Sequence, residues 1–402
     1  MRKIRTYILL TFIISMNLPA FSGNKKVTSV PFELAGSYVV LKTTINDSSP
    51  LSMILDTGVK STIINELMED DLLSLNKNNT DSTLIQGLGN NRGIKAYRSY
   101  KNEMKIGNIT FTNKAVVLLP DNIFNFTNYT GKKINGILGS DVLRDYVVEI
   151  NYTKSRVYFY ESETFVPPAK YSSITTSYAN NKLYVNADYT GNDSISRSVK
   201  MLVDTGAELG SWLFDSSISS LPEKKVYGYI GEGLSGEIMG YYARSVSLCL
   251  GPYCISNPIV TFPDTTYTKG LEQEIPRAGT LGNQTLKRFN CIIDFKKPAF
   301  YVKPNFMYNN KFRYNVAGIE VLREMPHFYI TRVYKVWKNS PAEAQGVKQG
   351  DLLLEVNGMK TFQMNVSEIR DIFETGRRFP LHIVIQRNDE VIDLDLNMNS
   401  KI

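Results

Sequence analysis

The chain has 402 residues, 43% of them hydrophobic and 21% charged, which provides apolar material for about two to four packed domains. Its formal net charge is +7, but three of the 46 basic residues and none of the 39 acidic ones lie in the first 22 positions, so the remainder carries +4. That modest charge, without a basic stripe interleaved with aromatics, argues against a nucleic-acid partner. With two histidines and three scattered cysteines, we expect no metal site, no cofactor and no histidine-activated nucleophile.

Residues 1–22 have the pattern of a secretory signal peptide. Basic residues at positions 2, 3 and 5 precede an apolar run at 7–16, and an exit with small residues at 20 and 22 follows. The run is too short for a spanning helix, although an N-terminal membrane anchor is the alternative. We therefore expect a secreted or periplasmic protein with no membrane span once the signal peptide is cleaved.

Two strand-like runs end in the same three residues. "SMILDTGVKSTII" at 52–64 leads into Asp56-Thr57-Gly58, and "VKMLVDTGAELGSWLF" at 199–214 leads into Asp204-Thr205-Gly206, 148 residues later. The abundance of Val, Ile, Thr and Tyr around them favours strands, so we predict a mostly β protein.

A second pair of landmarks keeps nearly the same spacing. "INGILGSDVLRDYVVEINYTKSRVYFYE" at 134–161 matches "RAGTLGNQTLKRFNCIIDFKKPAFYVKP" at 277–304, and the offset from Gly139 to Gly282 is 143. Each block reads as a glycine turn, a short helical turn and two strands. The shared spacing predicts a duplicated lobe, with one copy at 23–165 and the other at 166–306.

Each predicted lobe also contains a glycine-rich hairpin signal, at 85–97 and at 229–242. Glycine tips between strands allow a hairpin to approach a ligand backbone, and plain exposed turns are the alternative. The candidate substrate flaps are centred on Gly87, Gly89, Gly233 and Gly236.

The cysteines leave one pairing open. Cys249 and Cys254 flank a Gly-Pro turn in "SLCLGPYCISN", and they either close a hairpin disulfide in an oxidising compartment or remain free thiols. Cys291, in "FNCIIDF", is expected to be a buried strand residue.

Residues 310–402 have a different character and resemble a bacterial PDZ domain. The matching stretches are "SPAEAQG" at 340–346, "GD" at 350–351 and "VNG" at 356–358. Ser340 suits a helix N-cap with proline at the next position. The resemblance implies that a peptide adds as a strand beside Gly318, Ile319 and Val321, with a helix at 367–374, containing Ile369, as the other wall. The glycine-rich loop that binds a C-terminal carboxylate in PDZ domains is only weakly represented in this sequence. A docking module without a ligand is the alternative.

The two Asp-Thr-Gly lobes resemble the aspartic peptidases, and their short length is closer to retropepsin-like subunits. This resemblance implies two pseudo-symmetric β-barrel lobes that form one site, followed by the α+β PDZ domain. Because one chain carries both copies, a monomer suffices for the active site. The resemblance also implies that Thr57 and Thr205 brace the two loops against each other, and that the glycine blocks 136–139 and 279–282 pack beneath them.

The chemistry of two facing carboxylates agrees with this resemblance. Two carboxylates that share one proton can activate a water and protonate a leaving group, because like charges so close cannot both ionise. Asp56 and Asp204 are the candidate dyad, and Gly58 and Gly206 allow the tight turns that direct backbone N–H groups at them. Turn-capping aspartates are the alternative.

The chain departs from the family pattern at Lys60 and Glu208, which occupy equivalent positions after the two motifs. We expect them to pair with each other or to meet the substrate backbone, and a nearby ammonium would lower the pKa values of the dyad. The function predicted is an aspartic endopeptidase acting on an extended polypeptide, with the PDZ domain recruiting substrate or gating access. A catalytically silent peptide-binding protein and an enzyme acting on a peptidoglycan peptide are the alternatives.

Overall fold

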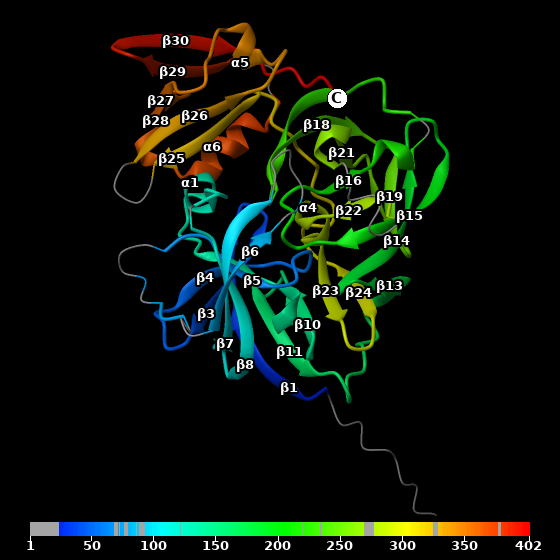
Figure 1. Cartoon of the computed structure of the whole chain (residues 1–402). Helices are drawn as coiled ribbons and strands as arrows, with labels where there is room; N and C mark the ends of the chain where they lie inside the picture. The colour runs from blue at the N-terminus through cyan, green and yellow to red at the C-terminus, as the bar shows by residue number, and fades with distance from the viewer. Residues whose placement is uncertain are drawn as a thin grey trace, which may run out of the picture.

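The structure is a computed structural model that describes residues 24–67, 71, 73–75, 79–85, 87, 93–120, 122–218, 220–233, 235–268, 277–324, 329–376 and 379–402. The predicted signal peptide and Gly89 lie outside the described residues. The chain is mostly β, and its strands form four sheets across the described ranges (Figure 1), which confirms the predicted fold class. No helix in these ranges is long and apolar enough to cross a membrane.

The first lobe is built on an eight-stranded sheet in which β3 also pairs with β7, so that the sheet curls towards a barrel. Its strands, in spatial order, are β2 (Glu33–Ala35), β3 (Tyr38–Ile45), β4 (Leu51–Leu55), β9 (Gly136–Leu138), β5 (Thr62–Ile64), β8 (Ile109–Leu118), β7 (Ile94–Ile106) and β6 (Thr80–Ile85). Two short helices, α1 (Phe126–Thr130) and η2 (Ser140–Val142), flank β9 in the sequence.

The second lobe repeats this arrangement in a ten-stranded sheet. Its path runs β17 (Val226–Gly233), β18 (Gly236–Arg244), β21 (Ile259–Pro263), β16 (Ser211–Leu213), β22 (Gly279–Leu281), β15 (Ser196–Val203), β14 (Lys182–Thr190), β19 (Ser247–Leu250) and β20 (Tyr253–Ser256), with β13 (Thr176–Ala179) paired to β14. Its short helices are η3 (Asp215–Ser217), α2 (Thr265–Thr268) and α4 (Asn283–Leu286). The order β3-β4-β9-β5-β8-β7-β6 recurs strand by strand as β14-β15-β22-β16-β21-β18-β17, so the sequence repeat is also a structural repeat.

A six-stranded sheet joins the two lobes. Its order is β1 (Lys26–Pro31), β11 (Arg156–Glu161), β10 (Tyr146–Asn151), β23 (Phe289–Asp294), β24 (Ala299–Pro304) and β12 (Ser172–Ile174). At its centre, β10 of the first half pairs antiparallel with β23 of the second, with Val148 opposite Ile293. All six residues of β23 are buried, so this sheet is a shared floor that holds the halves together.

The C-terminal domain is a separate sheet with two helices. Its strands are β25 (Ile319–Glu324), β26 (Ile330–Val336), β27 (Leu352–Val356), β29 (Leu381–Arg387) and β30 (Glu390–Leu396), with β28 (Met359–Lys360) paired to β27. The helices are α5 (Pro341–Ala344) and α6 (Val366–Phe373), with a 3-10 turn η4 (Thr361–Gln363). Ser340 caps α5 as expected, since its Oγ accepts from the Glu343 N–H at 3.1 Å. Strand β25 is at the edge of the sheet.

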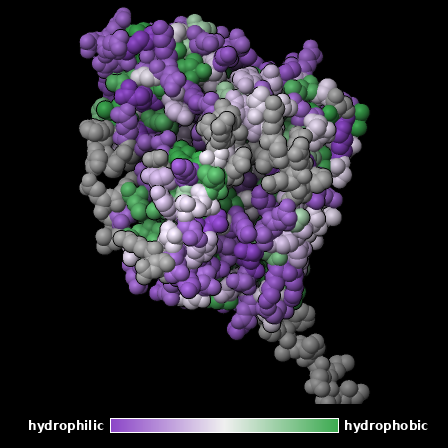
Figure 2. Space-filling model, viewed as in Figure 1, coloured by the Kyte–Doolittle hydropathy of each residue, from purple (hydrophilic) through white to green (hydrophobic). Residues whose placement is uncertain are grey.

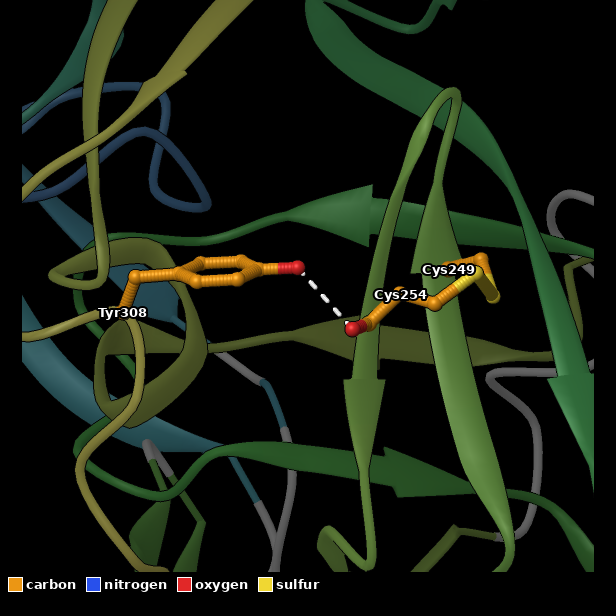
Figure 3. The surroundings of a disulfide bond; sticks show 3 residues. All are labelled: Cys249, Cys254 and Tyr308. Carbon is orange, nitrogen blue, oxygen red and sulfur yellow. Dashed lines mark hydrogen bonds between the residues drawn. A yellow bond between two sulfur atoms is a disulfide. The ribbon is translucent and has the colours of Figure 1, made fainter.

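The segment between the second lobe and the C-terminal domain is anchored at several points. Cys249 and Cys254 form a disulfide across the β19–β20 hairpin, and the Tyr308 hydroxyl donates to the Cys254 carbonyl at 2.9 Å (Figure 3). The Arg288 guanidinium donates to the Tyr308 carbonyl at 3.1 Å and lies 3.8 Å from the ring centre of Phe312. The linker is therefore attached to the second lobe along its length.

The surface seen from this side is mostly hydrophilic. Figure 2 shows apolar residues in small separate groups on this face, not as one continuous patch. Scattered apolar residues of this kind are normal for a folded protein, so the described residues on this face give no sign of a large apolar docking surface.

Candidate active site

Two strands bring the candidate carboxylates to the pseudo-symmetry axis. All five residues of β4 are buried, and the chain leaves β4 directly into Asp56. The Asp56 N–H donates to the Leu138 carbonyl at 2.9 Å, and the Asp204 N–H donates to the Leu281 carbonyl at 3.0 Å. Each aspartate is therefore held in place by the glycine-containing strand predicted to pack beneath it, β9 in one lobe and β22 in the other.

Four hydrogen bonds brace the two loops across the interface. Thr57 Oγ1 donates to the Val203 carbonyl and Thr205 Oγ1 donates to the Leu55 carbonyl, both at 2.7 Å. In return, each threonine hydroxyl accepts the N–H of the other threonine at 3.1 Å. Both side chains are buried, so these bonds are shielded from water. This is the brace that the resemblance implied.

The two carboxylates lie close together over the glycines. The Gly58 N–H donates to Asp56 Oδ1 at 2.7 Å, and the Gly206 N–H donates to Asp204 Oδ1 at 2.9 Å. A Cβ added at Gly58 would lie 2.6 Å from Asp204 Cγ, and one at Gly206 would overlap the Asp56 carboxylate. Each carboxylate thus packs against the glycine of the opposite loop, and any side chain there would displace it.

The electrostatics favour one shared proton. Burial raises the pKa of both aspartates, and the charge of Asp204 raises the pKa of Asp56 further. The hydrogen bond from the Gly206 N–H and the positive charges of Arg277 and Lys182 partly oppose the rise in the pKa of Asp204. A buried pair of this kind releases its two protons in separate steps, so one carboxyl stays protonated while the other is ionised.

The comparisons with known proteins agree with this geometry. A family model described as aspartyl protease matches residues 41–142, which include the first Asp-Thr-Gly motif and its glycine block. A PDZ domain model matches residues 332–387. The chain contains an aspartyl protease domain and a C-terminal PDZ domain. No curated protein matches the chain. The second motif lies outside the matched region, and its likeness to the first rests on the repeated strands and hydrogen bonds.

The hairpins expected to be flaps touch at their tips. The Gly87 N–H donates to Ser235 Oγ at 3.1 Å, between positions 148 residues apart, and Ser235 is buried. Gly233 pairs with Gly236 where β17 turns into β18. The two hairpins therefore contact each other at Gly87 and Ser235, and these two positions are not plain solvent-exposed turns.

The prediction that Lys60 and Glu208 pair with each other is wrong. Glu208 pairs instead with Arg370 of the PDZ domain, at 3.3 Å. Lys60 is exposed, and its side chain has no hydrogen-bond or ion-pair partner among the described residues. The reason is the pseudo-twofold axis, which places equivalent positions on opposite sides of the dyad. Sequence reasoning missed Arg370, because nothing local marks it as a neighbour of a motif 162 residues away.

The residues predicted to line a PDZ peptide groove are buried in the structure. Gly318 has φ +72° and packs directly against the Ser340 side chain, so it serves a close approach inside the domain. Ile319, Val321 and Ile369 are almost completely buried. Helix α1 of the first lobe contacts both β25 and α6, and Figure 1 shows it beneath these two elements. Helix α1 therefore lies beside the two elements that were predicted to form the walls of the groove.

The described residues offer no other obvious reactive centre. Within them, no group of three or more His, Cys, Asp or Glu residues is arranged to hold a metal ion. Cys291 is buried on β23, and burial raises the pKa of its thiol. The Asp56–Asp204 pair is thus the chemical feature from which a function is best argued.

Proposed function

We propose that this chain is an aspartic endopeptidase that hydrolyses peptide bonds with a water activated by Asp56 and Asp204. The observation that carries the proposal is the symmetric carboxylate pair. Each member directly follows a strand whose last three residues are buried, accepts a glycine N–H and belongs to a loop that the threonine brace fixes to the other. The alternative, in which the two aspartates only cap turns, does not explain why they face each other across two lobes.

The geometry suits general acid–base chemistry. The ionised carboxylate takes a proton from a water held between the pair, and the water oxygen attacks the peptide carbonyl carbon. The protonated carboxyl gives its proton to the carbonyl oxygen, which forms a neutral tetrahedral diol. When the C–N bond breaks, the carboxyl that took the water's proton gives it to the leaving nitrogen. The other carboxylate takes the proton of one diol hydroxyl as the new carboxylic acid forms, so the pair again holds one proton. The brace contributes by fixing both carboxyls within reach of the same water.

The proposed substrate is a polypeptide in extended form, bound between the lobes and below the hairpin tips. One chain supplies both aspartates, so a monomer is sufficient. We also propose a secreted or periplasmic location, which the Cys249–Cys254 disulfide and the signal-like leader support.

Cleavage of a mixed peptide library by the chain from residue 23, between pH 3 and 8, tests the proposal. Asp56→Asn and Asp204→Asn should each abolish cleavage, because one neutral amide cannot exchange the shared proton. Asp145→Asn is the matched control, since the Asp145 side chain is 70% exposed and outside the pair. Activity that survives either dyad substitution would refute the mechanism. Peptide binding without cleavage in the parent would favour the silent binding protein.

A further inference from the structure

The two ends of the candidate cleft differ in a way that the pseudo-symmetry does not require. Lys60 and Glu208 are equivalent positions four residues after the two aspartates, so they mark opposite sides of the dyad. Lys60 is exposed, whereas the side chain of Glu208 is only 14% exposed. The β2–β3 turn at Gly36 lies directly against the Glu208 carboxylate. The surroundings of the dyad are therefore covered on the Glu208 side, whereas the Lys60 side chain is exposed.

One PDZ side chain covers that end and contacts both lobes. The two terminal nitrogens of Arg370 donate to the two Glu208 oxygens, each at 3.3 Å. Arg370 also donates to the Tyr129 hydroxyl at 2.5 Å, and its guanidinium lies 3.9 Å from the Tyr129 ring centre. Tyr129 belongs to α1, so a single arginine connects the second Asp-Thr-Gly loop, the first lobe and the helix α6.

Helix α1 occupies the place where an extended peptide would bind. PDZ domains take peptides as an added strand between an edge strand and a helix, here β25 and α6. Helix α1 contacts both elements, and Gly131 at its end lies against Val366. No backbone hydrogen bond joins the described residues of α1 and β25. A strand bound at this edge would make the ladder bonds that α1 does not make.

We propose that α1 is the resident ligand of the PDZ groove, and that an extended polypeptide segment displaces it, releases Glu208 from Arg370 and opens that end of the cleft. The displacement of α1 and the release of Glu208 are linked, because Tyr129 on α1 and Glu208 both bind the guanidinium of Arg370. The part of this inference that concerns the cleft rests on the proposed peptidase function, whereas the part that concerns the groove does not.

A reversible cross-link tests whether α1 must leave. A Cβ at Gly131 would lie 3.5 Å from Val366 Cβ, which is within the range of a disulfide. Gly131 has φ +69°, so the cysteine itself modestly lowers the stability of the folded protein. The double variant Gly131→Cys/Val366→Cys should therefore link under mild oxidation of the folded full chain, and the two single variants should not. The parent receives the same oxidant and reductant, because its own disulfide also responds to them. Failure of the double variant to link in the folded protein would overturn the proposal.

Two measurements then compare the linked and the reduced double variant. A library of random dodecapeptides carrying a photoreactive group is cross-linked to the protein, and adducts on 319–324 and 366–373 are counted by mass spectrometry. We expect at least tenfold fewer adducts on the linked form, and at least tenfold slower cleavage of the library, both restored by reduction. Equal adduct numbers, whether high or nil, would overturn the proposal. Different adduct numbers with no cleavage in either form would keep the groove inference and reject the peptidase.

A milder variant keeps the test valid if the double variant does not fold. Tyr129→Phe retains the ring and removes only the hydroxyl that binds Arg370, so groove adducts and cleavage should both rise at least threefold. Tyr301→Phe on β24 is the matched control, because the Tyr301 hydroxyl has no hydrogen-bond partner among the described residues. Equal adduct numbers in Tyr129→Phe and Tyr301→Phe would overturn the proposal.

Discussion

Replacing Thr205 by valine tests whether the threonine brace holds the two lobes together. Valine keeps the shape of threonine and removes only the hydroxyl. That hydroxyl donates to the Leu55 carbonyl at 2.7 Å and accepts the Thr57 N–H at 3.1 Å, in a side chain that is 1% exposed. In the variant, both backbone groups lose their partner while they remain buried.

The magnitude follows from the number of groups left without a partner. A buried donor or acceptor that loses its hydrogen bond costs about 1–3 kcal/mol, so two of them predict a loss of about 2–6 kcal/mol in the free energy of unfolding. Thr280→Val is the matched control. Thr280 is fully buried, and its hydroxyl has no hydrogen-bond partner in the part of the chain that the structure describes. Removing that hydroxyl should therefore leave stability unchanged or raise it.

Urea unfolding followed by tryptophan fluorescence measures both variants. Trp212 lies in the second lobe, and Trp337 of the PDZ domain stacks on Tyr242 of the second lobe. Unfolding of the second lobe and its separation from the PDZ domain should therefore both change the fluorescence. The reasoning would be refuted by a loss below about 1 kcal/mol in Thr205→Val, or by an equal loss in Thr280→Val.

Two further changes probe the surroundings of the dyad. Burial raises the pKa of the Asp141 carboxyl from 3.8 to about 6. Between these pH values the folded protein keeps a proton on Asp141 that the unfolded chain has released. The free energy of unfolding therefore falls as the pH rises through this range. Asp141→Asn should therefore raise the free energy of unfolding at pH 7.5 by up to about 3 kcal/mol and have little effect at pH 3.5; urea titrations at both pH values measure this, and equal effects would contradict it. Gly58→Ala should reduce peptide-library cleavage more than a hundredfold, because the new Cβ would lie 2.6 Å from Asp204 Cγ. Gly346→Ala, at φ +77° with open space around it, should cost about 1 kcal/mol of stability and leave cleavage unchanged.

The dyad could be predicted from the sequence because its signal is local and repeated. An apolar strand that ends in Asp-Thr-Gly places a carboxylate at a strand end, and the second copy 148 residues later gives it a partner of equal geometry. The strand content and the cap of α5 at Ser340 also depend on near neighbours. The helix α6 begins at Val366, one residue before the predicted start, because Asn365 and Glu368 form a capping box there.

The contacts of the PDZ domain could not be predicted in the same way. Arg370 is one of 46 basic residues, and its ion pair with Glu208 depends on how the two lobes and the PDZ domain pack together. The pairing expected between Lys60 and Glu208 failed for a related reason, since positions that match in sequence are kept apart by the symmetry. Helix α1 has only five residues, "FTNYT", without the apolar periodicity that would mark a helix. Its place against β25 and α6 follows from tertiary packing alone.

The shared six-stranded floor has a consequence for how the chain is made. Strand β10 is synthesised about 140 residues before its partner β23. The edge of β10 that pairs with β23 is therefore unpaired while the second half of the chain is being synthesised. An unpaired edge strand is a template for another chain. A product released after residue 165 would offer this edge to a second copy of itself, and the association of two such fragments would rebuild by dimerisation the floor that the intact chain completes with its own repeat.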